Sequence, residues 1–174
     1  MNFLIGKTAI GWIALVWTDL GLKKIQLPST SKETTLLTLK QFLDEDLLEV
    51  KKNMAPQFII NFFEELHEYL RGELTQFSKV ARDESAHSEF QKSIYKSLQS
   101  TGYGKTLSYE EMAVRIGKPK AARAVGLALG KNSFPILVPC HRVISKSKKI
   151  GGFTAPLGLS TKMKLLEIEG LTKI

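Results

Sequence analysis

The chain has 174 residues, 43% of them hydrophobic and 24% charged, which is typical of a folded globular protein and excludes a disordered or fibrous one. Its longest early apolar stretch, residues 9–17, is far short of the roughly 18 residues of a membrane span. With a single cysteine and no leader before that stretch, we expect a cytoplasmic protein without disulfides and without a membrane partner.

The net charge of +8 is unevenly distributed along the chain. Residues 1–99 carry 12 Lys or Arg against 13 Asp or Glu, whereas residues 100–174 carry 13 against 4. A basic second part favours a polyanion such as nucleic acid as partner, because each neutralised phosphate releases a counterion. A solubilising surface would give the same excess.

The first part of the chain, residues 1–80, predicts a small α/β domain. It begins with three segments that have the composition of β-strands: residues 3–5, 9–17 and 22–27. The last two segments are joined by Thr18-Asp19-Leu20-Gly21, which predicts a β-hairpin with glycine at the tight position.

Two helices should follow these strands. A capping-box pattern over residues 30–33 opens the first of them. Hydrophobic residues at helical spacing predict the second over residues 56–71, with Gly72 as its C-terminal cap. The polar residues 44–53 are expected to form a loop between the helices, and residues 75–86 a linker to a second domain.

The second part, residues 86–174, predicts a domain of short helices. A capping box over residues 88–91 opens the first helix. Ser108 opens another helix, and after a glycine-containing turn a further helix is expected over residues 120–129. Helix, short turn and helix in this order are typical of the helix-turn-helix of DNA-binding proteins, although many such corners bind nothing.

The helix expected over residues 120–129 carries Arg123 among alanines and Gly126. Small side chains let a helix backbone approach a groove closely, and a single long cation is then suited to probe that groove. Tight packing against another helix would favour the same small residues. The segment alone leaves both interpretations open.

The single cysteine lies in the run Pro139-Cys140-His141-Arg142-Val143. Most free cysteines are small buried hydrophobic residues, but a thiol reacts as its thiolate, and a neighbouring imidazole can take the proton while a guanidinium steadies the anion. The apolar residues 136–138 between two prolines predict a stiff extended segment that presents Cys140. Because neighbours in a strand point to opposite faces, contact between Cys140 and His141 would need a turn or a bridging water.

Five separated motifs resemble, in order and spacing, those of the O6-alkylguanine-DNA alkyltransferase family. They are Ser108-Tyr109, Lys120-Ala121-Ala122-Arg123-Ala124-Val125-Gly126, Asn132, Pro139-Cys140-His141-Arg142-Val143 and Glu169-Gly170. The resemblance implies an α/β (α+β) fold of two domains. Residues 1–80 would be ribonuclease-H-like, and residues 86–174 would form a winged-helix domain that holds the cysteine.

The resemblance also implies roles at the reacting centre. Cys140 would attack the alkyl carbon on guanine O6, with His141 as base through a water. Glu169 would hold the imidazole in its useful tautomer, and Tyr109 would donate a proton or hydrogen bond to the departing guanine. Three further residues would support the site: Asn132, Arg142 and Lys162. Because a thioether has no good leaving group, each molecule should accept one alkyl group and stop, without a cofactor.

The implied partner is double-stranded DNA that contains O6-alkylguanine, with O4-alkylthymine as a further candidate. The helix with Arg123 would lie in the minor groove, where Arg123 fills the gap left by a flipped base. Other DNA contacts are expected from Lys120, Ala121, Ala122, Gly126 and Ser108. Walls of the base pocket are expected from Leu129, Ile150, Gly151, Phe153 and Thr154. We expect a monomer associated with the nucleoid and, because the first domain has no cysteine, no metal.

Three other functions fit parts of the pattern. A non-catalytic binder of alkylated bases would lack the reactive cysteine that is present here. A winged-helix regulator with a redox- or alkylation-sensing cysteine is the main alternative, and it would favour one operator sequence and a dimer. A Cys-His hydrolase would need an oxyanion pocket and a turnover substrate, and nothing in the sequence points to either.

Overall fold

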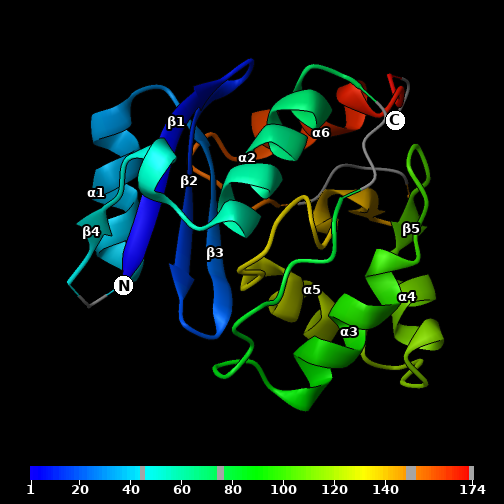
Figure 1. Ribbon diagram of the computed structural model, residues 1–174. Coiled ribbons are helices and arrows are strands. Elements are labelled where there is room, and N and C mark those ends of the chain that lie inside the picture. Colours follow the sequence, from blue (N-terminus) through cyan, green and yellow to red (C-terminus); the bar gives the residue numbers. More distant parts are fainter. Residues whose placement is uncertain (44–45, 74–76, 148–151, 173–174) are drawn as a thin grey trace. The chain divides into compact units, whose positions relative to one another are not determined.

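The computed structural model describes residues 1–43, 46–73, 77–147 and 152–172 (Figure 1). They form two compact units, which we call unit 1 (Met1–Asp83) and unit 2 (Glu84–Ile174). Both units contain helices and strands, so the expected mixed α+β class is confirmed. Among the described residues, no helix has the length and apolar character needed to cross a bilayer.

Unit 1 is built on a four-stranded sheet in the order β3-β2-β1-β4 (Figure 1). Its strands are β1 (Asn2–Thr8), β2 (Gly11–Thr18), β3 (Gly21–Ser29) and β4 (Leu48–Glu49). The first three are antiparallel, and β4 runs parallel to β1. Strand β2 lies between two neighbours because its run of apolar residues is buried on both faces.

The hairpin predicted at residues 18–21 is confirmed, since Thr18 pairs with Gly21 across a two-residue loop. The strand expected over residues 9–17 begins later than predicted. Ala9 and the next residue form a second tight turn, closed by the pairing of Thr8 with Gly11. Gly11 has a φ of 128°, a conformation that favours glycine and lets the chain reverse there.

Two helices cover opposite faces of this sheet. Helix α1 (Lys32–Phe42) places Leu39 against Phe3 on one face. On the other face, helix α2 (Gln57–Leu70) sets Phe63 so close to Gly6 that an added Cβ would lie 2.4 Å from the ring. The helix cap predicted at Gly72 agrees with its φ of 90°.

Two local predictions for unit 1 are wrong in detail. The N-cap of α1 is Ser31, whose hydroxyl accepts a hydrogen bond from the Thr34 amide at 3.1 Å, so the capping box expected over residues 30–33 is not formed. The loop expected over residues 44–53 contains β4 and the start of the 3₁₀ helix η1 (Lys52–Met54), while residues 44–45 lie outside the described part. Strand β4 forms because β1 offers it a free edge, which no local pattern reveals.

The stretch expected to be a linker, residues 75–86, belongs in part to unit 1. The Leu22 amide donates to the Ala81 carbonyl at 2.9 Å, and the Asp83 amide donates to the Leu22 carbonyl at 2.8 Å. Asp83 is buried and forms an ion pair with Lys23 at 2.9 Å. Residues 81–83 therefore extend the edge of β3, and the division between the units falls after them.

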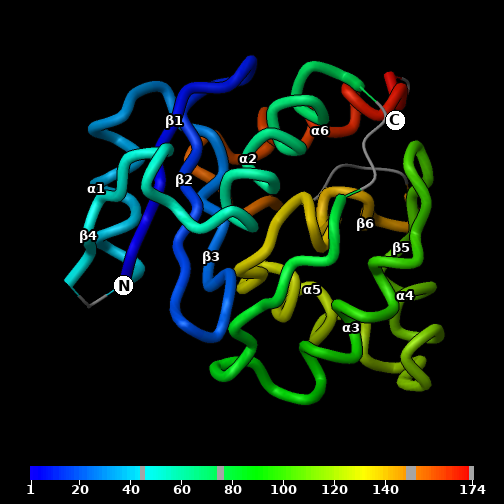
Figure 2. Tube along the Cα trace, in the orientation of Figure 1, coloured from blue at the N-terminus to red at the C-terminus, as the bar shows by residue number. Residues whose placement is uncertain are grey.

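Unit 2 contains four α-helices and a pair of short strands among its described residues. The helices are α3 (Glu89–Gln99), α4 (Tyr109–Arg115), α5 (Ala122–Gly130) and α6 (Leu159–Ile168). Strands β5 (Leu107–Ser108) and β6 (Val143–Ile144) run side by side in parallel (Figure 2). Ser88 and Ser108 form the capping boxes of α3 and α4, as predicted. Helix α5 begins at Ala122, later than expected, because Lys120 and Ala121 belong to the turn that precedes it.

The segment before Cys140 is folded back rather than extended, so that prediction is wrong. Ile136 has a φ of 73°, and the Val138 amide donates to the Phe134 carbonyl at 2.7 Å across the turn. Cys140 then opens the short 3₁₀ helix η2 (Cys140–Arg142). The chain therefore turns between Cys140 and His141. A turn was one of the two arrangements, beside a bridging water, that contact between these side chains would need.

Candidate active site

Cys140 is buried at the start of η2, between the turn of residues 133–139 and β6. Burial raises the pKa of its thiol, because a thiolate is poorly solvated in an apolar interior. A hydrogen bond from Asn132 and the positive charge of Lys162 act in the opposite direction, but more weakly. The resting thiol is therefore protonated at neutral pH and needs a base to become a nucleophile.

His141 and Glu169 form a buried pair next to this thiol. The His141 Nε2 atom lies 2.8 Å from Oε1 of Glu169. Burial would raise the pKa of the Glu169 carboxyl, but hydrogen bonds from His141 and Arg142 and the positive charge of Arg142 lower it to about 2. An ionised carboxylate only accepts hydrogen bonds, so Nε2 carries the proton and Nδ1 is the basic nitrogen. Burial lowers the pKa of His141, which keeps the imidazole neutral and able to accept a proton at pH 7.

Arg142 connects Glu169 to another segment of unit 2. Its guanidinium donates to both carboxylate oxygens, with Nε at 2.8 Å from Oε2 and Nη2 at 2.8 Å from Oε1. It also donates to the Thr101 carbonyl, and the Gly104 amide donates to Oε2 of Glu169 at 3.2 Å. Sequence reasoning missed Thr101 and Gly104, because both act through backbone groups. The available signal was the glycine itself, whose φ of 67° permits the tight turn there.

Asn132 braces the turn that leads to Cys140. Its side-chain amide donates to the Val138 carbonyl at 2.9 Å, and its Oδ1 atom accepts from the Phe134 amide at 2.9 Å. Both ends of the turn are thus tied to one side chain. Loss of this amide would leave buried backbone groups without partners.

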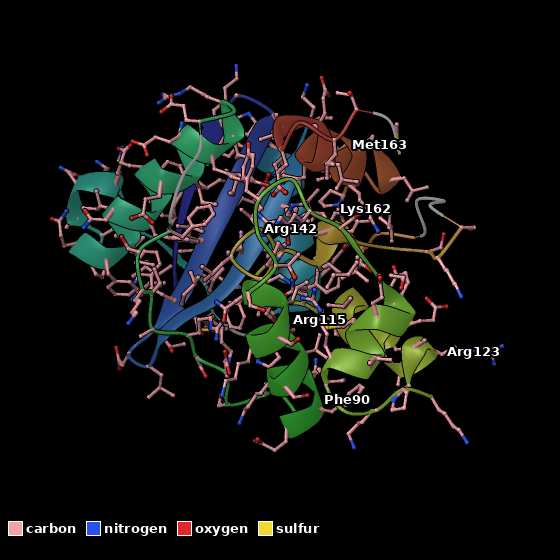
Figure 3. The ribbon with its side chains drawn as sticks, turned by 90° about the vertical axis from the view of Figure 1, so that its right-hand side faces the viewer. Phe90, Arg115, Arg123, Arg142, Lys162 and Met163 are labelled. Carbon is pink, nitrogen blue, oxygen red and sulfur yellow. The ribbon has the colours of Figure 1, made fainter. Side chains whose placement is uncertain are left out.

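Lys162 of α6 is almost completely buried beside the thiol, and Figure 3 shows it in the same part of unit 2 as Arg142. Its Nζ atom donates to the Val143 carbonyl at 2.7 Å and lies 5.9 Å from the centre of the Phe153 ring. Burial lowers the pKa of this lysine, whereas the charge of Cys140 raises it. The ammonium group therefore ties α6 to the first residue of β6, which is also the last residue of the run around Cys140.

Two tyrosines lie near Cys140. Tyr109 is half-buried at the start of α4, and its ring would lie 3.6 Å from a Cβ added at Gly126 of α5. Burial first, and then the charge that Cys140 carries when ionised, raise its pKa, so the Tyr109 hydroxyl is protonated and able to donate a hydrogen bond. Tyr95 was missed by sequence reasoning. It is fully buried on α3, its hydroxyl donates to the Lys131 carbonyl at 3.5 Å, and burial first, then Cys140, raises its pKa to about 12.

The residues predicted to contact a partner lie around α5. Arg123 is exposed and extends outward from its helix (Figure 3). Lys120 is exposed before the helix, whereas Ala121, Ala122 and Gly126 are half-buried. The Ser108 hydroxyl accepts from the Glu111 amide at 3.1 Å, so this side chain is occupied by capping α4.

Only three of the five residues predicted to form walls of the base pocket lie in the described part of the chain. Leu129 is buried at the end of α5, Phe153 is half-buried, and Thr154 is exposed. The Thr154 hydroxyl oxygen would lie 3.6 Å from a Cβ added at Gly130. Ile150 and Gly151 lie outside the described residues. In the described parts of both units, no three His, Cys, Asp or Glu side chains are close enough to hold a metal ion.

Unit 2 thus combines an excess of basic residues, two helices joined by a short turn, and a buried cysteine, histidine and glutamate, features expected of a nucleic-acid-binding protein with a reactive thiol. Residues 89–171 match the family model described as the DNA binding domain of 6-O-methylguanine DNA methyltransferase. The methylated-DNA–protein-cysteine methyltransferase of Methanosarcina acetivorans is 36% identical over 172 residues, which cover 98% of this chain and 99% of that protein. The enzyme of the same name from Mycolicibacterium paratuberculosis is 46% identical over 114 residues, covering 66% of this chain and 67% of that one.

A solved structure agrees with these sequence relatives. The crystal structure of Mycobacterium tuberculosis OGT in complex with DNA has a TM-score of 0.77 and 33% identity, and the match covers 97% of this chain and 92% of that one. The chain belongs to the methylated-DNA–protein-cysteine methyltransferase family, so the family and enzyme class expected from the motifs are confirmed.

Proposed function

We propose that this protein repairs alkylated DNA by moving an alkyl group from O6 of guanine directly onto the sulfur of Cys140. The observation that carries the proposal is the buried thiol beside a neutral His141, which an ionised Glu169 holds at 2.8 Å. Support comes from the names of the relatives and from the DNA complex of the M. tuberculosis protein. The basic second part of the chain agrees with a polyanionic substrate.

The transfer is a direct displacement. The proton of Cys140 passes through a water to Nδ1 of His141, and the resulting thiolate attacks the alkyl carbon. The new S–C bond forms as the C–O6 bond breaks, and guanine leaves with the electron pair. Tyr109 gives a proton or hydrogen bond to the leaving base, and the proton that His141 accepted passes through water to Tyr109 or to the guanine. Cysteine and O6-methylguanine thus become S-methylcysteine and guanine.

The surroundings of the sulfur favour this step once the proton has left. The Lys162 ammonium and the Asn132 amide both stabilise the thiolate, whereas burial destabilises it. A poorly solvated anion is a strong nucleophile. Glu169 fixes the imidazole tautomer, and Arg142 holds Glu169 in place with hydrogen bonds to both carboxylate oxygens.

We propose that α5 enters the minor groove and that the damaged base is flipped out of the helix. Flipping costs a few kcal/mol of stacking, which Arg123 would offset by filling the vacated gap. Further contacts would come from the turn at Lys120 and from the small side chains of α5. Such contacts read the shape and charge of the duplex more than its sequence.

The fold assignments stay part of this proposal. Unit 1 is ribonuclease-H-like, supported by the order β3-β2-β1-β4 with β4 parallel to β1. Unit 2 is a winged helix, supported by the α4–α5 corner and the β5–β6 pair. We further propose a monomer that acts once on nucleoid DNA in the cytoplasm, with O4-alkylthymine as a second substrate to be tested.

The regulator with a sensing thiol is less well supported. A redox sensor needs an exposed cysteine of low pKa. Cys140 is buried, and its pKa is raised. A buried thiol of raised pKa agrees better with transfer of an alkyl group from a base that is bound next to it.

Mass spectrometry of the Cys140 peptide tests the proposal. After incubation with duplex DNA containing O6-methylguanine, the peptide should gain CH₂, one per protein molecule. Cys140→Ser should remove transfer and keep DNA binding. A wild-type peptide without added CH₂ would refute the proposal, whatever the affinity for DNA.

A further inference from the structure

Helix α5 exposes one large apolar side chain whose position the fold does not explain. Leu127 is 72% exposed, whereas Val125, Ala128 and Leu129 of the same helix are buried. Those three residues form the face that packs into unit 2. Leu127 therefore contributes little to the core of its own unit.

Leu127 shares its face of the helix with Arg123. Residues four apart in an α-helix lie one above the other, so both side chains leave α5 in nearly the same direction. Arg123 is exposed and points outward (Figure 3). The residue between them on the exposed surface, Ala124, is too small to reach as far. The outer face of α5 thus presents one cation, Arg123, and one branched apolar side chain, Leu127, with only the small Ala124 exposed beside them.

The unit that carries this pair is strongly basic. Residues 84–174 contain 15 Lys or Arg against 6 Asp or Glu. This charge selects a polyanion as the occupant of the α5 face over an apolar protein partner. The minor groove of DNA offers both chemistries that the pair requires: a negative potential, and walls of deoxyribose whose C–H groups are apolar. Proteins that bind this groove often insert a leucine or another apolar wedge beside their cations.

We propose that Leu127 is a second minor-groove residue, which packs against the deoxyribose walls one helical turn from Arg123. This inference rests on the proposed function, because it assumes that α5 meets DNA. The groove is about 6 Å wide in B-DNA, so a helix that enters it must open it. Leu127 holds the groove open by burying its apolar surface there, while Arg123 occupies the gap in the base stack.

The test compares Leu127→Ala, Leu127→Met and a control, Leu37→Ala, for binding to a duplex containing O6-methylguanine. Leu37 lies on α1 in unit 1 and is 63% exposed, so it matches Leu127 in type and exposure. Leu127→Ala should bind about tenfold more weakly, the effect of leaving much of one leucine side chain unburied. Leu127→Met and Leu37→Ala should bind like the wild type, and all three should keep the wild-type melting temperature.

Salt dependence separates an apolar contact from a phosphate contact. For Leu127→Ala, the slope of log affinity against log salt should stay at the wild-type value, because no counterion release is lost. Its rate of methyl transfer from duplex should fall with the affinity, while its reaction with free O6-methylguanine should be unchanged.

Failure of the proposed function and failure of the inference about Leu127 give different results. If the wild-type Cys140 peptide gains no CH₂, the proposed function fails. If the wild type transfers methyl and Leu127→Ala matches it in affinity, the inference about Leu127 is overturned and the proposed function stands. A smaller salt slope for Leu127→Ala, or an equal loss of affinity for Leu37→Ala, would overturn the inference in the same way.

Discussion

Replacement of Glu169 by glutamine tests the centre of the site. Glu169 is buried and accepts hydrogen bonds from His141, Arg142 and the Gly104 amide. Its pKa is about 2, against an ordinary value of 4.5. A difference of this size corresponds to about 3 kcal/mol of stability. Because the folded pKa is the lower one, this stability is present above pH 4.5 and is lost as the pH falls toward 2.

Glu169→Gln should therefore lower the free energy of unfolding by about 3 kcal/mol at pH 7, and the difference from the wild type should shrink toward zero near pH 2. Urea denaturation at several pH values measures it. Both tryptophans, Trp12 and Trp17, lie in unit 1, so far-UV circular dichroism is needed to follow unit 2. Methyl transfer should also slow by about 100-fold or more, because the glutamine amide carries no negative charge and can also donate, so it no longer stabilises a protonated His141 or fixes its tautomer.

Glu167→Gln is the matched control. Glu167 lies in the last turn of α6, two residues before Glu169, but it is exposed and pairs with Lys164 at 3.0 Å on the surface. Its replacement should change stability by no more than about 0.5 kcal/mol at any pH. Equal stability of Glu169→Gln and this control at pH 7, or a deficit that persists unchanged at pH 2, would refute the stabilising role of the ionised Glu169.

Three further outcomes are expected. Lys162→Met should slow methyl transfer about tenfold at neutral pH, because the cation that lowers the pKa of Cys140 is removed; an unchanged rate would exclude that role. The pH profile of the wild-type rate should stay flat down to pH 6.5 and fall below it, since burial lowers the pKa of His141; a fall that begins above pH 6.5 would contradict its role as neutral base. Gly6→Ala should destabilise unit 1 by about 1–3 kcal/mol, because the new methyl would lie 2.4 Å from Phe63; thermal unfolding followed by tryptophan fluorescence should show it, and an unshifted curve would mean that the ring moves freely.

Local chemistry made several elements of this protein predictable. The hairpin at residues 18–21 follows from the backbone freedom of Gly21, and the capping boxes at Ser88 and Ser108 need partners only three residues away. The reactive run around Cys140 could be recognised for the same reason, since a thiol, an imidazole and a guanidinium stand next to one another in the chain.

The site itself was decided by contacts between distant segments. Cys140 is presented by a folded turn because Asn132 satisfies backbone groups at both of its ends. Arg142 reaches the Thr101 carbonyl, 41 residues away in sequence, and no local pattern contains that pairing.

The sequence by itself determined the chemical groups of this protein and the short elements that carry them, because these depend on neighbours a few residues apart. Only the tertiary structure decided that burial raises the pKa of Cys140 and lowers that of His141, and that hydrogen bonds lower the pKa of Glu169. Those shifts follow from burial and from partners across unit 2, and burial is a property of the whole fold.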